Sequence, residues 1–238
     1  MAVNPATEGV GVSGVFGQAA RQELWRERLA VPTYTVKAAA DLSSTKLATV
    51  SYWLRHSRSG GPLIPERPVY WNLSWYQLVE VAFVATMRSF GVSLQRIRRA
   101  REWLAHEYDV EYPFALLRLR TEGSHILMEA DSASGQPLLV VADDHGQIAW
   151  ERILSERYEQ FDYEHDLALT WYPRGRRSPV SVDPRIAYGL PAVGGVPTRA
   201  IYQRFAAGEA LDDLSEDYGL QLGLVIQALS FEGVGLSK

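Results

Sequence analysis

The apolar positions between residues 34 and 54 predict two short helices. These positions recur at spacings of three and four residues, which places them on one side of each helix. In the first helix they are Val36, Ala39, Ala40 and Leu42, and in the second Thr49, Val50, Trp53 and Leu54. The intervening DLSSTK has the composition of a turn. The pattern therefore predicts a helix-turn-helix.

The second of these helices should turn a polar face outward. A lysine, hydroxyl groups and an arginine on the exposed face of a helix suit contacts to DNA phosphates and to the edges of the bases. The outward residues are Lys46, Ala48, Ser51, Tyr52 and Arg55. Residues 56–71 follow with Gly-Gly-Pro and two further prolines, which predicts a β-hairpin, or wing.

Residues 72–91 predict a third helix with a clear start. Ser74 and Gln77 have the spacing of a capping box, and Leu73 and Leu78 that of a hydrophobic staple. Gly91 is placed to end the helix. Because this helix is apolar on most sides, it forms either the core of the N-terminal half or an interface between copies.

Residues 92–108 predict a further amphipathic helix. Its core positions are Leu94, Ile97, Ala100 and Leu104, and its other faces carry Arg96, Arg98, Arg99 and Arg101. Two interpretations of the arginines stay open. They form a solvated face with Glu102 and Glu107, or they contact backbone phosphates of DNA.

From residue 114 the pattern changes to short runs with a period of two. Strands are predicted at 125–130, 137–142, 167–173 and 179–182, with a helix at 150–161. Residues 196–232 return to helical spacing and predict three helices, the first two ending at Gly208 and Gly219.

The predicted fold class is α+β, with four segments along the chain. These are an N-terminal extension with a short helix at 18–30, a winged helix-turn-helix, a central α+β unit and a C-terminal three-helix module. Their expected bounds are 1–33, 34–112, 113–180 and 181–238. The glycine-rich 189–197 lacks the lysine of a phosphate-binding loop, so we interpret it as a tight connection with unusual backbone angles.

Composition and charge narrow the functional classes. The 238 residues are 47% hydrophobic, enough for a real core, and cysteine is absent, which excludes disulfides and cysteine-bound zinc. The N-terminus does not resemble a signal peptide, and the most apolar window, 78–87, is too short to cross a bilayer. We therefore expect a cytoplasmic protein without a membrane partner.

The net charge of −4 divides unevenly along the chain. Residues 1–120 hold 15 basic and 10 acidic side chains, a net +5, whereas residues 121–238 hold 9 and 18, a net −9. A basic N-terminal half and an acidic C-terminal half suggest two partners of opposite charge. The alternative is a chance asymmetry between solvated faces. The acidic face of the last helices consists of Glu209, Asp212, Asp213, Glu216 and Asp217. It would repel DNA and suits a basic protein.

No catalytic constellation stands out. The five histidines are scattered, and the groups DDHG (143–146) and YEHD (163–166) lack the spaced second ligand of a metal site. We expect no enzymatic activity, no cofactor and no metal. An enzyme using the central carboxylates is the least favoured interpretation.

Three stretches together resemble a known family. The pattern Y-x-V-x-x-A-A-x-L … T-V-x-x-W-L at 34–54 resembles the winged helix-turn-helix of MerR-like regulators, which usually carry glycine where this chain has Ser44. SLQRIRRAREWL at 93–104 precedes YPFA at 112–115. Residues 182–232 are similar to a C-terminal module of bacterial antitoxins that is labelled only as a domain of unknown function. In this order the stretches resemble VapB-type antitoxins of mycobacteria and actinobacteria.

The resemblance implies two partners. Such antitoxins silence a toxin from an adjoining gene, commonly a PIN-domain ribonuclease, and bind their own operator DNA as homodimers. Carried over, the DNA face comprises Lys46, Thr49, Ser51, Tyr52 and Arg55, with Arg58 on the wing. Thr49 as a packing or capping residue and Tyr52 as a core residue are the alternatives. The acidic face defined above is the expected toxin-binding surface. A stand-alone regulator that senses a small molecule in the central unit is the competing interpretation.

Overall fold

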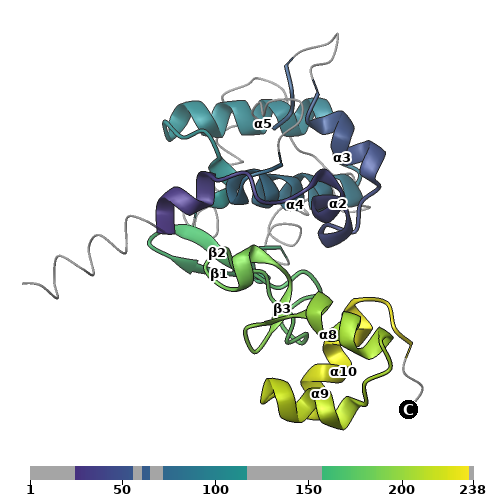
Figure 1. The fold of residues 1–238 in the computed structure, drawn as a ribbon. Helices are drawn as coiled ribbons and strands as arrows, with labels where there is room; N and C mark the ends of the chain where they lie inside the picture. The colour runs from purple at the N-terminus through teal and green to yellow at the C-terminus, as the bar shows by residue number, and fades with distance from the viewer. Residues whose placement is uncertain (1–24, 56–60, 65–71, 117–156, 236–238) are drawn as a thin grey trace, which may run out of the picture.

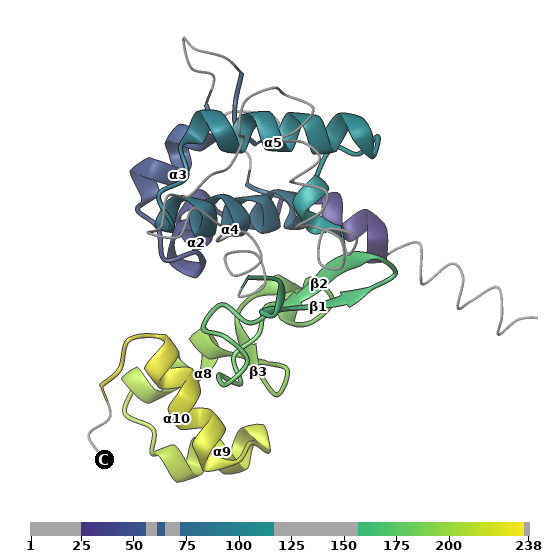
Figure 2. The same cartoon turned by 180° about the vertical axis from the view of Figure 1, so that it is seen from behind.

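The computed structural model describes residues 25–55, 61–64, 72–116 and 157–235. The fold is α+β. A layer of helices forms the N-terminal half, and a β-hairpin lies below it. A C-terminal helical module lies below the hairpin (Figures 1 and 2). Of the wing predicted at 56–71, the structure describes residues 61–64, which form no strand. Arg58 and the strands predicted at 125–130 and 137–142 lie outside the described residues. No helix in the described ranges is long and apolar enough to cross a membrane.

The helix-turn-helix predicted at 34–54 is confirmed. Helix α2 spans Val36–Leu42 and α3 spans Leu47–Trp53. The Thr35 side chain caps α2 by accepting from the Ala38 amide at 3.0 Å. Ala39 and Ala40 of α2 and Val50 and Trp53 of α3 are buried, as their spacing indicated. The small alanines let the two helices pack closely.

The turn after α2 places a non-glycine residue in a left-handed conformation. The Thr45 amide donates to the Ala40 carbonyl at 2.8 Å, and the Ser44 amide donates to the Asp41 carbonyl at 3.2 Å. This pair of bonds is the Schellman motif, whose left-handed position favours glycine. Ser44 occupies that position with φ of 53°. The turn therefore has the geometry that glycine adopts most easily, and serine adopts it with backbone strain.

We expect Ser44→Gly to raise the free energy of unfolding by about 0.5–1 kcal/mol, because glycine adopts this conformation without a Cβ clash. Chemical denaturation of the full chain measures the effect. Ser44→Ala is the matched control, since alanine keeps the clash and should give no gain. An equal gain from alanine would contradict the argument.

The helix predicted at 72–91 is α4, Trp75–Ser89. The capping box is present: the Ser74 amide donates to the Gln77 side chain at 3.0 Å, and the Gln77 amide donates to the Ser74 hydroxyl at 3.3 Å. Twelve of its fifteen residues are buried within the single chain. Of the two interpretations, α4 is therefore the core of the N-terminal half, and its apolar faces are not available to a second copy.

Helix α5, Leu94–Glu107, confirms the helix predicted at 92–108 and packs with the short 3₁₀ helix η1, Pro113–Ala115, beside α4. Ile97, Ala100 and Leu104 are fully buried, as expected. The interpretation of Arg101 as a surface residue is wrong. Its guanidinium lies in the core, where Nε is 2.7 Å from a carboxylate oxygen of fully buried Glu80.

The strand predicted at 167–173 is β2, Leu167–Trp171, and it pairs in antiparallel register with β1, Phe161–Glu164. The two-residue loop His165–Asp166 has φ values of 50° and 64°, as in a type I′ hairpin turn. The helix predicted at 150–161 is wrong at its end, because Phe161 already belongs to β1. The hairpin contacts α4, where the Trp75 indole donates to the Ala168 carbonyl at 2.7 Å. One core therefore joins the N-terminal helices and the hairpin.

The segment from 179 to 197 forms short pairings in place of a long strand. Val182 bridges to Trp171 and Ser181 to Ala192, so residues 181 and 182 are the paired part of the strand predicted at 179–182. After the 3₁₀ helix η2, Ala187–Gly189, strands β3, Ala192–Val193, and β4, Val196–Pro197, form a hairpin. Its turn residues Gly194 and Gly195 both have positive φ, as the tight connection predicted.

The three C-terminal helices are confirmed as α8, Thr198–Ala206, α9, Leu211–Tyr218, and α10, Leu222–Phe231. Gly219 ends α9 in the left-handed conformation. These helices enclose a second core with Val180 and Val193. The helical spacing of the apolar residues of α10 predicts Leu222 on the buried face, but its side chain is 39% exposed, and Ala228 is buried in that core.

Candidate nucleic-acid interface

The structure places the predicted DNA-contacting residues around helix α3. Lys46, Tyr52 and Arg55 are exposed, and Thr49 and Ser51 are partly buried. The Tyr52 side chain is 54% exposed, so its interpretation as a core residue is wrong. Thr49 is not a cap either, because the N-cap of α3 is Lys46. Arg58 lies outside the described residues.

These residues do not form one continuous face. An α-helix turns by about 100° per residue. Ser51 and Tyr52 therefore lie away from buried Val50 and Trp53. Arg55 follows the C-cap of the helix and is exposed. Lys46 and Thr49 instead line a pocket of about 440 Å³ at the edge of the helix, together with Trp53. The structure thus divides the predicted site into an outer face and a basic pocket.

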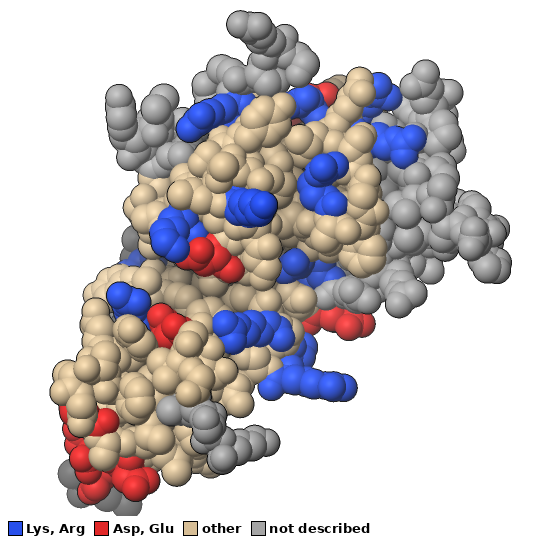
Figure 3. Space-filling model, turned by 90° about the vertical axis from the view of Figure 1, so that its right-hand side faces the viewer, with Lys and Arg blue, Asp and Glu red and all other residues tan. Residues whose placement is uncertain are grey.

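The cations of this region are available to a ligand. Lys46 and Arg55 form no ion pair with any acidic residue in the described part of the chain. Figure 3 shows Lys and Arg side chains over the upper, helical part and the middle of the molecule, with some Asp and Glu among them, whereas the coloured side chains at the lower tip are Asp and Glu. Unpaired cations on one end suit a polyanion, since their charge is not already neutralised.

The arginines of α5 have different environments. Arg101 is buried, as described above. Arg98 donates to the Gly61 carbonyl at 3.1 Å, which ties α5 to the segment that follows α3. It is half-buried, as are Arg96 and Arg99. The interpretation of all four as one solvated or phosphate-binding face is therefore wrong.

Two basic residues beside α3 escaped the sequence analysis. Arg88, in the last turn of α4, and Arg157, just before β1, line the same pocket as Lys46. Arg157 reaches it from a position 111 residues further along the chain than Lys46. No local pattern could indicate this, because only the tertiary fold brings the three cations to one place.

The same fold occurs in a second protein. No protein-family model matches the chain, and no curated protein matches it. Two solved chains match its structure. One is the crystal structure of Rv2018 from Mycobacterium tuberculosis, with a TM-score of 0.69 and 26% sequence identity. The match covers 85% of this chain and 99% of Rv2018.

The acidic surface predicted on the C-terminal module is partly occupied by internal pairing. Asp212, Asp213 and Glu216 are exposed on α9. Glu209 and Asp217 instead share Arg204, whose guanidinium donates to both carboxylates. The free acidic surface is therefore smaller than the five residues predicted.

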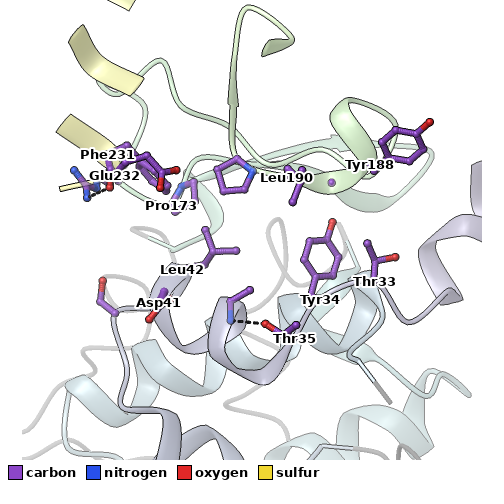
Figure 4. Close-up of a pocket in the computed structure, with 15 residues that line it drawn as sticks. Thr33, Tyr34, Thr35, Asp41, Leu42, Pro173, Tyr188, Leu190, Phe231 and Glu232 are labelled. Atoms are coloured by element: carbon purple, nitrogen blue, oxygen red, sulfur yellow. Dashed lines mark hydrogen bonds between the residues drawn. The ribbon is translucent and has the colours of Figure 1, made fainter. Parts of the chain in front are cut away.

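A cleft of about 540 Å³ separates α2 from the C-terminal module. Figure 4 shows Tyr34 and Leu42 on one wall and Leu190 and Phe231 on the other, with the Tyr34 ring directed across the gap. The Tyr34 hydroxyl is buried and has no hydrogen-bond partner among the described residues. Burial, and secondarily the Asp183 carboxylate, raises the pKa of Tyr34, so the hydroxyl stays protonated.

In the described ranges, no group of three or more His, Asp or Glu side chains is arranged so that it could hold a metal ion. YEHD at 163–166 forms the end of β1 and the hairpin turn. DDHG at 143–146 lies outside the described residues.

Proposed function

We propose that this chain is a cytoplasmic antitoxin of the VapB type, which binds operator DNA through α3 and neutralises a toxin encoded by the adjoining gene. The observation that carries the proposal is the outer face of α3. It presents Tyr52 to solvent on a helix that packs against α2, and Arg55 is exposed directly after the C-cap of that helix. In helix-turn-helix proteins the second helix enters the major groove in this way.

The charge distribution supports two separate partners. The described residues 25–116 hold ten basic and seven acidic side chains, whereas 157–235 hold seven and eleven. DNA is negatively charged and suits the basic N-terminal half. A ribonuclease binds RNA through a basic surface, which suits the acidic C-terminal half. Asp212, Asp213 and Glu216 are the exposed candidates for that second contact.

Co-expression tests the antitoxin function. The adjoining reading frame is expressed alone and then with this chain, and growth and co-purification are measured. The proposal expects the neighbour to stop growth alone, to be harmless in the pair and to co-purify with this chain. A harmless neighbour that does not co-purify would remove the antitoxin proposal and leave a free-standing DNA-binding protein.

Charge reversal tests the assignment of the toxin surface. Asp212→Lys, Asp213→Lys and Glu216→Lys combined should weaken toxin binding at least tenfold, because the contact becomes repulsive. Calorimetry of the purified pair measures this. A matched control reverses Glu102, Glu107 and Asp109, which are exposed acidic residues at the other end of the molecule. Unchanged toxin binding in the α9 variant would assign the toxin contact to another segment.

The cleft beside Tyr34 favours a second candidate, a regulator that senses a small molecule. Its volume lies in the range of ligand sites, about 300–1,000 Å³. It differs from the predicted location, because it lies between α2 and the C-terminal module and not within the central unit. A harmless neighbouring gene product combined with specific DNA binding would favour this candidate.

A further inference from the structure

The pocket at the edge of α3 has the composition of an anion site. Lys46 comes from the N-cap of α3, Arg88 from the last turn of α4, and Arg157 from the segment before β1. No Asp or Glu is among the described residues that line it. Three cations from three elements in one pocket of about 440 Å³ repel one another unless an anion lies between them.

Arg157 is the strongest single indication. Its Nη1 donates to the Gln160 side chain at 2.7 Å, its Nε donates to the Thr86 hydroxyl, and its guanidinium stacks 5.8 Å from the Trp171 ring centre. All three partners are neutral, and no described carboxylate pairs with it. Burial lowers the pKa of Arg157 to about 10, so the group remains charged at neutral pH. A largely buried charge whose described partners are all neutral is costly, and an anion would offset the cost.

The hydrogen-bond donors that remain unused are also suited to phosphate. The hydroxyls of Ser43, Thr45, Thr86 and Ser89 donate to backbone carbonyls within their own turns. Among the described lining groups, this leaves the Lys46 ammonium and the Ser44 and Thr49 hydroxyls. It also leaves the guanidinium nitrogens that remain after Arg88 Nη1 donates to the Val92 carbonyl and Arg157 Nε and Nη1 donate to Thr86 and Gln160. Charged donors of this kind recognise phosphate oxygens.

We propose that this pocket binds one backbone phosphate of the DNA that α3 reads, and that Arg157 thereby connects the central unit to the DNA-binding half. The inference rests on the proposed DNA binding. The phosphate contact would fix the position of α3 along the DNA through Arg157, a residue far from α3 in the sequence. Lys46 and Thr49 belong to this phosphate contact, and Tyr52 and Arg55 to the groove-facing side. A phosphate held at one edge of a recognition helix positions that helix without reading sequence.

The test is a titration of a labelled duplex with the full chain at several salt concentrations. Arg88→Ala and Arg157→Gln should each lower the slope of log Kd against log salt by about 0.9, the value for one phosphate. They should weaken binding equally on specific and unrelated duplexes. Because both arginines hold the same phosphate, the double variant should also lose about one phosphate and not two.

Arg157→Lys keeps the positive charge and should retain most of the slope, whereas a purely structural role of Arg157 would affect melting temperature without changing the slope. Arg177→Ala removes an exposed arginine outside the pocket and is the control for lost net charge. Unchanged slopes in Arg88→Ala and Arg157→Gln, with normal DNA binding by the unsubstituted chain, would overturn the phosphate pocket and leave the proposed function intact. Additive losses of two phosphates would also overturn it.

A second measurement separates DNA from a free phosphate. The melting temperature of the full chain is compared in inorganic phosphate and in chloride of equal ionic strength. If phosphate stabilises the chain but not Arg88→Ala, while no duplex binds, the pocket serves a free phosphate group, and both the DNA contact and the proposed function are overturned.

Discussion

Arg101→Met is expected to destabilise the protein by about 3–5 kcal/mol, the typical cost of leaving one member of a buried ion pair without its partner. Glu80 is fully buried, and its carboxylate accepts from Arg101 Nε at 2.7 Å and from the Phe114 amide at 3.0 Å. Arg101 also donates to the Glu111 carbonyl. The pair therefore joins α4, α5 and η1. Chemical denaturation at neutral pH measures the loss.

The pH dependence identifies the cause of this loss. Burial raises the pKa of Glu80, and the Arg101 guanidinium opposes that effect. Without Arg101 the pKa should rise further. When a carboxyl has a higher pKa in the folded than in the unfolded protein, the protein loses stability as the pH rises from the unfolded-state pKa to the folded-state pKa. The deficit of Arg101→Met should therefore be smaller at pH 5 than at pH 7.5.

Glu80→Gln combined with Arg101→Met is the matched variant. Glutamine stays neutral and still accepts from the Phe114 amide, so the double variant should be more stable than Arg101→Met alone. A double variant that is less stable, or a deficit independent of pH, would show that lost packing and not an unpaired charge dominates.

Lys46→Ala combined with Arg55→Ala is expected to weaken DNA binding by about 10- to 100-fold at moderate salt, since a phosphate contact and a base-edge contact are both lost. The slope of log Kd against log salt should fall by about 0.9 for each phosphate contact removed. Folding should not change, because Lys46 makes no side-chain cap bond and Arg55 is exposed. Fluorescence anisotropy and a thermal melt measure both effects.

The control for this double variant removes the same charge elsewhere. Arg28 and Arg177 are exposed and lie outside the helix-turn-helix. Arg28→Ala with Arg177→Ala should leave affinity within about threefold of the unsubstituted chain, because distant surface charges are screened beyond roughly 10 Å. If both double variants bind DNA as the unsubstituted chain does, the DNA-binding face lies away from α3.

Local signals in the sequence predicted most of the described helices. The Ser74 and Gln77 capping box and the glycine after α9 act over a few residues, so their effect is visible in the sequence itself. The turn after α2 formed although serine stands at the left-handed position, because the packing of α2 against α3 outweighs the strain at Ser44. The β1 strand was missed because its turn residues, His165 and Asp166, lack the usual asparagine-glycine signal.

The long-range part of the site could not be predicted. Arg101 has the spacing of a surface residue on α5, and only the position of Glu80, 21 residues earlier, draws it into the core. A glutamate within the otherwise apolar α4 was the available signal, because a buried carboxylate needs a partner. Arg157 reaches Thr86 across 71 residues, and nothing near it in the sequence indicates that contact.

Binding of the unsubstituted chain to DNA tests the central claim most directly. The measurement is a titration of a labelled duplex from upstream of the chain's own gene, with an unrelated duplex of equal length beside it, at 50 and 200 mM salt. We expect the upstream duplex to bind at least 1,000-fold more tightly, as is usual for specific sites, and both affinities to fall steeply with salt. Equal affinity for the two duplexes, or no binding at 50 mM salt, would contradict the account.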